Sequence, residues 1–155
     1  MDINSLPYRK NVAIIVFKND KFLLVNKHEF KKDWWKFPQG GLNKNENIKE
    51  CAKREFLEEV GTDNIEIVGI SKFSHKYDWN NMEIVQRKKA RGQEQYFIIA
   101  EFKGKFSEVK PDDKEIRKVD WVDVKTIEKY SNENKELFEM YSDLIPKILK
   151  EFNFI

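Results

Sequence analysis

The sequence predicts a single α/β domain over residues 1–155. Runs rich in β-branched and aromatic residues stand on both sides of one strongly periodic helical stretch. The chain contains no internal repeat, low-complexity tract or linker rich in Gly, Ser or Pro that would mark a second domain. Its length is sufficient for one domain with a sizeable hydrophobic core.

The first predicted elements form a hairpin. Val12–Phe17 and Phe22–Val25 are β-rich runs, and the polar residues between them are typical of a turn. A third, short strand is predicted over Trp34–Phe37, ending at the Pro38 break.

The clearest element is a helix over Asn47–Val60. This stretch lacks Gly and Pro and carries Ile48, Ala52, Phe56 and Val60 at four-residue steps, which predicts a helix with one packed side. Gly61 follows and provides its stop.

Further strands and a last helix complete the prediction. The strands are expected over Ile65–Phe73, Gln95–Phe102 and Lys118–Val122. Apolar residues at helical spacing predict a helix over Asn134–Phe152, which Pro146 should kink or divide.

Composition and charge exclude several classes of protein. The 29 Lys and Arg nearly balance the 27 Asp and Glu, with a formal net charge of +2, so we predict no DNA readout and expect attraction to phosphates only from local patches. Cys51 is the only cysteine, which excludes an internal disulfide and a multi-cysteine zinc site. We interpret it as a small core residue.

No segment predicts membrane association. The N-terminus, MDINSLPYRK, lacks the apolar run of a signal peptide, and no later stretch approaches the roughly 20 apolar residues that span a bilayer. We therefore expect a soluble, cytoplasmic protein. The sequence predicts no particular oligomeric state.

Three carboxylates crowd one face of the predicted helix. Glu55, Glu58 and Glu59 fall within an arc of roughly 100°, because side chains three and four residues apart are neighbours on a helix. Their mutual repulsion calls for positive charge, and grouped oxygen ligands suit Mg²⁺ or Mn²⁺. Cys51 and Ala52 lie one turn earlier on nearly the same side, which places the acids in a cleft. The alternative is a solvated acidic helix without a task.

The whole stretch Gly40–Thr62, GGLNKNENIKECAKREFLEEVGT, resembles the Nudix box, the signature of enzymes that hydrolyse nucleoside diphosphates linked to another moiety. This resemblance covers the chain from about Tyr8 to the C-terminus. It implies a Nudix fold, in which a mixed β-sheet lies between helices in an α/β/α sandwich.

The resemblance also implies roles for individual residues. Glu55, Glu58 and Glu59 bind divalent ions, and the Gly40 carbonyl adds a ligand. Glu115 comes from a loop to complete the metal site or act as base. The catalytic base is Glu58 or Glu115, which the sequence leaves open. Glu46 and Arg54 are structural, with the Arg54 guanidinium orienting a box carboxylate.

Four further segments resemble one Nudix subgroup, that of bacterial RNA pyrophosphohydrolases and plant-type diadenosine tetraphosphate hydrolases. They are Tyr8–Val12, Trp35–Gly41, Gly92–Gln95 and Glu115 six residues before Trp121. The leading prediction is a pyrophosphohydrolase acting on 5′-triphosphorylated RNA, so the expected partner is a nucleotide or 5′-phosphorylated RNA. The alternatives are an asymmetric dinucleoside tetraphosphate hydrolase, a nucleoside triphosphate or nucleotide-sugar pyrophosphatase, and a non-catalytic Nudix-fold binding module.

Several residues are candidate substrate contacts, of which Arg9 is suggested by the subgroup pattern. The candidates are Arg9, Gln39, Gln95, Tyr77 and Trp79. Arg9 would contact phosphate or be a solvated charge, whereas Tyr77 and Trp79 would stack on a base or pack their loop onto the sheet.

A basic run lies beside these candidates. Its members are Arg87, Lys88, Lys89 and Arg91. Such a run can attract RNA or simply be solvated.

The chain departs from the family pattern at three places. Asn45 stands where Gly is common, Thr62 where a bulky aliphatic is usual, and Tyr96 where this subgroup commonly has Lys. The replacement of Lys by Tyr96 bears on how phosphate is bound at that position.

Overall fold

The computed structural model describes residues 2–29, 34–133 and 144–155. Its strands are β1 (Tyr8–Lys18), β2 (Lys21–Lys27), β3 (Gln39–Gly41), β4 (Ile65–Asp78), β5 (Gly92–Phe102) and β6 (Ile116–Val122). Its helices are α1 (Ile48–Val60), α2 (Met82–Lys88), α3 (Val124–Glu133) and α5 (Leu144–Glu151), with 3-10 turns η1 (Ile3–Ser5) and η2 (Phe106–Glu108). None of the described helices is long and apolar enough to cross a membrane.

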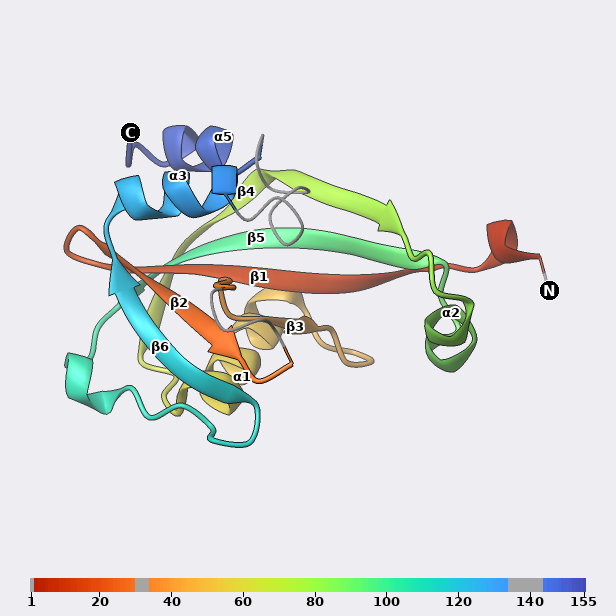
Figure 1. Ribbon diagram of the computed structural model, residues 1–155, viewed down its shortest axis with the longest axis horizontal. Helices are drawn as coiled ribbons and strands as arrows, with labels where there is room; N and C mark the ends of the chain where they lie inside the picture. The colour runs from red at the N-terminus through yellow and green to blue at the C-terminus, as the bar shows by residue number, and fades with distance from the viewer. Residues whose placement is uncertain (1, 30–33, 134–143) are drawn as a thin grey trace.

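One mixed sheet runs through the middle of the molecule. Its strand order is β4-β5-β1-β2-β6, with β3 added to β1. β1 is parallel to β5, whereas its other pairings and those of β2 with β6 and β4 with β5 are antiparallel. α1 covers one side of this sheet, and α3 and α5 cover the other (Figure 1). The predicted α/β/α sandwich is thereby confirmed.

Alternating side chains of β1 supply both cores. Val12, Ile14 and Val16 pack in the cluster that contains the apolar face of α1. Ala13 and Ile15 pack in the opposite cluster, under α3 and α5. This alternation follows from the two-residue period of a strand, and it places a fully packed layer beneath each side of the sheet.

The first hairpin opens soon after its turn. β1 and β2 pair only at Phe17 with Phe22 and at Lys18 with Lys21, around a two-residue turn. Further along, β1 pairs instead with β3, and β2 pairs with β6. β3 therefore lies where the two hairpin strands have separated.

The predicted strand over Trp34–Phe37 is wrong. In that segment only Lys36 makes a strand-like bridge, exchanging backbone hydrogen bonds of 2.7 and 2.9 Å with Val25. Trp35 and Phe37 turn into the core under α3 and α5. The short strand β3 begins after Pro38, whose carbonyl accepts a hydrogen bond from Ile14 at 2.8 Å. Proline lacks an N–H but keeps this acceptor, so it marks the entry to β3.

The predicted central helix is confirmed, with local signals at both ends. Asn47 caps its N-terminus in a capping box, because its side chain accepts from Glu50 at 2.8 Å while the Glu50 carboxylate accepts from the Asn47 backbone at 3.2 Å. Gly61 ends it in the left-handed conformation, with φ 82°. Asn45, one of the three departures from the family pattern, also has a positive φ, of 67°, which Asn tolerates better than most residues.

The remaining predicted elements are present with shifted bounds. β4 continues to Asp78 and β5 begins at Gly92, so Tyr77 and Gln93 lie in paired strands and not in a loop or turn. The prediction of a last helix is confirmed over Leu144–Glu151, and residues 134–143 lie outside the described residues. α2 and α3 were not predicted, because each is too short for a clear apolar period.

We expect Gly61→Ala to lower the free energy of unfolding by about 1–2 kcal/mol. The backbone at Gly61 is left-handed, and a Cβ there would lie 2.2 Å from the Lys110 carbonyl oxygen. Urea denaturation would measure the loss. Asn45→Ala is the matched comparison, since it has a similar φ but an exposed site. An equal loss in both variants would contradict the close approach at Gly61.

Candidate functional site

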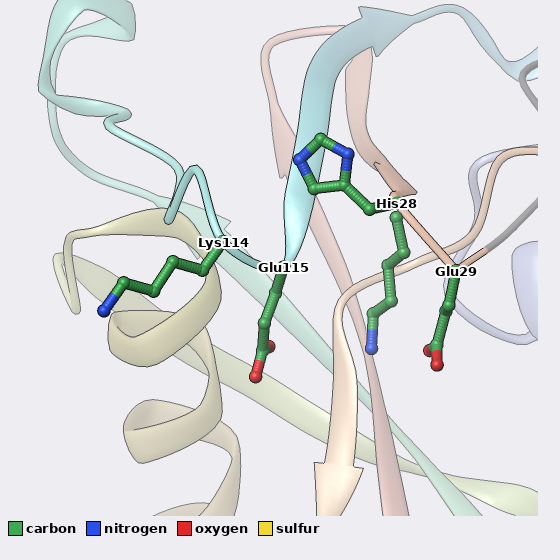
Figure 2. A pocket seen from close by; sticks show the side chains of 5 residues that line it. His28, Glu29, Lys114 and Glu115 are labelled. Atoms are coloured by element: carbon green, nitrogen blue, oxygen red, sulfur yellow. The ribbon is translucent and has the colours of Figure 1, made fainter.

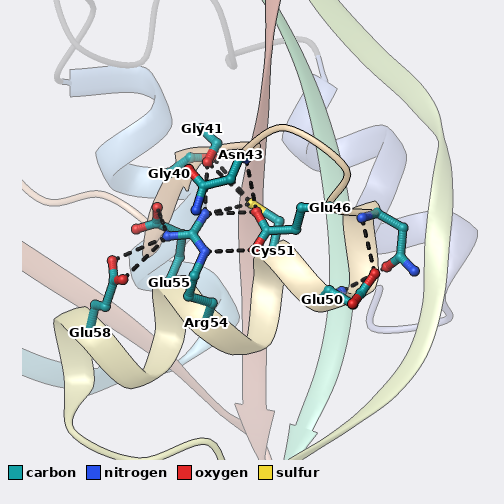
Figure 3. Close-up of polar contacts among 10 residues, drawn as sticks. Gly40, Gly41, Asn43, Glu46, Glu50, Cys51, Arg54, Glu55 and Glu58 are labelled. Carbon is teal, nitrogen blue, oxygen red and sulfur yellow. Dashed lines mark hydrogen bonds and ion pairs between the residues drawn. The ribbon is translucent and has the colours of Figure 1, made fainter.

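One guanidinium organises the acidic face of α1 (Figure 3). Arg54 donates two hydrogen bonds to Glu46, of 2.6 and 2.8 Å, and one to the Gly41 carbonyl at 2.9 Å. It also donates to Glu55 at 2.8 Å and approaches Glu58 at 3.3 Å. Arg54 therefore ties the helix to the loop that precedes it, a task for which the planar fork of arginine is suited.

The ionisation of these groups follows their contacts. The Arg54 hydrogen bonds lower the pKa of Glu46 to about 2. Burial raises the pKa of Glu55, against the opposing effect of Arg54. Burial also raises the pKa of Cys51 to about 12. Its thiol is fully buried, which confirms that Cys51 is a core residue.

The chain approaches the helix closely at Gly40. A Cβ at this position would lie 1.9 Å from the Glu55 carboxyl carbon, so only glycine fits without displacing the acid. The close packing brings the backbone of β3 directly against Glu55. The two groups that the sequence placed together at the metal site are thus neighbours.

Glu59 is the most buried acid of the cluster, with 2% of its surface exposed. Its Oε1 lies 3.0 Å from the Lys27 ammonium, and its Oε2 is buried without a hydrogen-bond partner. Burial raises the pKa of Glu59 to about 7, although Lys27 and a backbone hydrogen bond from Gln39 lower it. Lys27 was not singled out in the sequence. The only possible signal was its place at the end of the second strand, which does not reveal the partner.

The three helix acids do not converge on one point. Glu55 turns toward Arg54 and Glu59 toward Lys27, while the Glu58 side chain is 57% exposed. Among the described residues, no group of three His, Cys, Asp or Glu side chains encloses a position for a metal ion. The positive charge that offsets the repulsion among these carboxylates comes from two side chains of the protein, Arg54 and Lys27.

Glu115 stands at the edge of an open cavity of about 320 Å³ (Figure 2). The other lining residues are Lys27, His28, Glu29 and Lys114. The loop that carries Glu115 is held to α1 and β2, because Asp112 donates to the Glu59 carbonyl at 3.2 Å and His28 donates to the Glu115 carbonyl at 3.0 Å. Lys27 belongs to this cavity and also contacts Glu59, so it links the Glu115 side of the site to the helix acids.

Gln39 and Gln95 belong to a polar network that crosses three strands. The Gln95 amide donates to Gln39 at 2.8 Å and to Asn11 at 2.6 Å. Gln95 is 1% exposed and Asn11 is buried. Gln95 is therefore placed to hold Gln39 rather than to meet a substrate itself. Asn11 was missed in the sequence because its partner lies 84 residues away.

The other substrate candidates lie toward the N-terminal end of β1. The Arg9 guanidinium lies against Gly41, where a Cβ would be 2.6 Å from its Nη2. Tyr77 accepts a hydrogen bond from Gln93 at 2.8 Å and stacks on His75. Trp79 follows β4 and has the Lys88 ammonium 5.8 Å from its ring centroid.

The acid cluster has the chemistry of a divalent-ion site. It offers carboxylate oxygens, a nearby glycine carbonyl and a buried carboxylate oxygen on Glu59 that lacks any hydrogen bond. An orphaned buried oxygen is unfavourable, and a hard cation would satisfy it. Carboxylate and carbonyl oxygens are the ligand types that Mg²⁺ and Mn²⁺ prefer, so the chemistry of these residues fits such an ion.

Known proteins share this sequence pattern and this fold. A model of the NUDIX domain matches residues 7–144. An RNA pyrophosphohydrolase from Bartonella henselae is 34% identical over 143 residues, which are 82% of this chain and 83% of the relative. A second RNA pyrophosphohydrolase, from Pelagibacter ubique, is 31% identical over 156 residues and 96% of each chain.

Two solved structures show the same fold. A MutT protein from Methanosarcina mazei Go1 has a TM-score of 0.67 at 20% identity, with 96% of this chain and 97% of that chain covered. An Ap4A hydrolase from C. elegans has a TM-score of 0.60 at 14% identity, with 94% and 96% covered. At these identities the likeness concerns the fold alone.

We expect Arg54→Lys to lower the free energy of unfolding by about 1–3 kcal/mol, because lysine cannot replace the paired hydrogen bonds to Glu46. Urea denaturation would measure the change. The neighbouring exposed Lys53→Ala is the control and should remain within about 0.5 kcal/mol of the wild type. An Arg54→Lys protein as stable as the control would show that the fork geometry does not matter.

Proposed function

Because this chain belongs to the Nudix family of hydrolases, we propose that it is a Mg²⁺- or Mn²⁺-dependent enzyme that releases pyrophosphate from 5′-triphosphorylated RNA. The observation that carries the proposal is the acidic face of α1, whose Glu55 carboxylate packs against the Gly40 backbone of β3. The names of the Bartonella and Pelagibacter relatives support RNA as substrate, and the second of these aligns with nearly the whole chain.

In this proposal, Glu55, Glu58, Glu59 and the Gly40 carbonyl hold the divalent ion, with Glu115 reaching in from its loop. The bound ion would neutralise charge on the phosphate oxygens and lower the pKa of a water molecule. Arg54 fixes the rotamer of Glu55 and thereby orients one ligand. Lys27 similarly holds Glu59 in place.

Glu58 and Glu115 remain the two candidates for the general base. Both are exposed, so either can reach a water molecule and pass its proton to solvent. Glu55 and Glu59 are less suited to this role, since their side chains are only 15% and 3% exposed.

The substrate contacts follow from the positions on β1, β3 and β4. Arg9 lies beside the glycines of the box and is proposed to contact phosphate. Gln39 on β3, which accepts a hydrogen bond from Gln95 at 2.8 Å, is proposed as a second contact. Tyr96 donates to Glu94 and thus offers no positive charge where the subgroup commonly has Lys. The phosphate grip therefore depends on Arg9 and on cations elsewhere.

We expect Glu58→Gln and Glu115→Gln to separate base from ligand. The base variant should lose about 100-fold or more in kcat while keeping the metal affinity of the wild type. Titration calorimetry with Mg²⁺ and turnover of triphosphorylated RNA are the two measurements. If each variant loses metal affinity in proportion to turnover, neither residue is the base.

Metal should stabilise the folded protein through Glu59. At a Mg²⁺ concentration 100 times Kd, the free energy of unfolding should rise by about 2.7 kcal/mol. Glu59→Gln should abolish most of this gain, whereas Glu128→Gln on α3, on the far side of the sheet, should retain it. Urea denaturation with and without Mg²⁺ measures both. Equal gains in the two variants would remove Glu59 from the metal site.

A side-by-side assay tests the substrate. With Mg²⁺ present, we expect pyrophosphate release from triphosphorylated RNA at a kcat/KM at least tenfold above that for diadenosine tetraphosphate. Turnover of the dinucleotide alone would establish the asymmetric tetraphosphate hydrolase instead. Turnover of free nucleoside triphosphates alone would indicate a nucleotide pyrophosphatase.

A further inference from the structure

A series of close contacts leads away from the acid cluster. Gly40 packs against Glu55, and the next residue, Gly41, packs against the Arg9 guanidinium. Arg9 in turn lies at the start of β1, paired with Gln93 of β5. The Arg9 guanidinium therefore lies one residue along β3 from the contact between Gly40 and Glu55.

α2 stands beside this end of the sheet. It connects β4 to β5 and lies at the end of the sheet where β1 begins (Figure 1). The backbone fixes its place, because Arg91 donates to the Pro7 carbonyl at 3.0 Å and Trp79 donates to the Arg91 carbonyl at 2.9 Å. Val85 anchors the helix, with 1% of its surface exposed. The last turn of α2 is thus held close to the segment that carries Arg9.

The four cations of the basic run have different roles. Arg91 pairs with Asp78 at 3.1 Å and stacks on the Tyr8 ring. Lys89 caps α2 in the left-handed conformation, with φ 54°. Both of these residues have structural roles that the sequence did not reveal.

Arg87 and Lys88 are exposed in the last turn of α2. Within the described part of the chain, neither they nor Arg9 form an ion pair with a carboxylate. Burial and the nearby charges of Arg9 and Arg87 lower the pKa of Lys88, against the opposing effect of the Glu29 carboxylate. Arg9, Arg87 and Lys88 repel one another as like charges, and a bound anion would relieve that repulsion.

We propose that Arg9, Arg87 and Lys88 form a cationic track that binds the phosphodiester backbone of RNA just beyond its 5′ phosphates, with a base stacked on Trp79. The proposal rests on the proposed function and adds a contact for the body of the substrate. Trp79 flanks the track, since Lys88 lies over its ring. A cationic groove next to an aromatic side chain is the usual combination for binding single-stranded nucleic acid.

The track favours RNA over a free nucleotide. A nucleoside triphosphate has all of its phosphates at the reacting end, so it leaves none for α2. An RNA chain brings one further phosphate with each nucleotide. The gain from the track should therefore grow with chain length and weaken with salt.

The test compares Arg87→Ala/Lys88→Ala with the wild type on triphosphorylated RNA of increasing length. For a single-stranded substrate of about ten nucleotides, kcat/KM should fall by roughly fivefold to twentyfold, mostly through KM, and the salt dependence should become shallower by about 1 in log–log slope. For a nucleoside triphosphate, kcat/KM should stay within twofold of the wild type. Trp79→Ala should also raise KM for the long RNA alone.

The control is Lys49→Ala/Lys53→Ala, which removes two exposed cations from the outer side of α1, where they line a separate groove with β4. This protein should behave as wild type with both substrates. An equal loss in the control would show a general effect of net charge and overturn the track, as would a loss that is independent of RNA length.

The outcomes also separate the two proposals. If the wild type releases pyrophosphate from RNA and Arg87→Ala/Lys88→Ala keeps its KM and salt dependence, only the track is overturned. If the wild type does not act on RNA, the proposed function fails and the track falls with it.

Discussion

The arrangement of the site depends on the contacts of a single side chain, Arg54. Its guanidinium binds Glu46 in the loop before α1, the Gly41 carbonyl of β3 and the Glu55 carboxylate on its own helix. These contacts fix the helix, the loop and the strand relative to one another. The hydrogen bonds are charge-assisted and partly shielded from water, which makes them stronger than exposed ion pairs. Without the Arg54 contacts, the acids would keep their spacing along α1, but α1 would no longer be fixed relative to the loop and to β3.

The separation of β1 and β2 determines where β3 and α1 meet. β1 and β2 separate soon after their turn, and β3 enters beside β1 with glycine at the point of closest approach to α1. A continuous hairpin would place larger side chains there and would hold the helix acids away from the backbone. The opening also leaves Lys27 at the end of β2 within reach of Glu59. The geometry of the site therefore depends on the early separation of β1 and β2 in the sheet.

The sequence predicted those features that depend on neighbours along the chain. The spacing of apolar residues and the Gly61 stop are local, and they placed α1 almost to the residue. Features that depend on distant partners were missed, including Lys27 with Glu59 and the amide network around Gln95. The β-rich segment at Trp34 misled because its aromatic residues enter the core without pairing as a strand. The basic run also did not reveal which of its cations form ion pairs, as Arg91 does with Asp78.

Charge balance explains why attraction for RNA has to come from outside the acid cluster. Around α1, four carboxylates (Glu46, Glu55, Glu58 and Glu59) face two cations, Arg54 and Lys27. The Lys36 ammonium also acts on Glu59. When all of these groups are ionised, negative charge still exceeds positive charge, so the cluster favours metal and repels phosphate before metal binds. The cations of the track, Arg9, Arg87 and Lys88, form no ion pair with a carboxylate among the described residues. The phosphodiester backbone of a long RNA can thus bind the track while its 5′ phosphates contact the metal ion, and the two contacts do not interfere with each other.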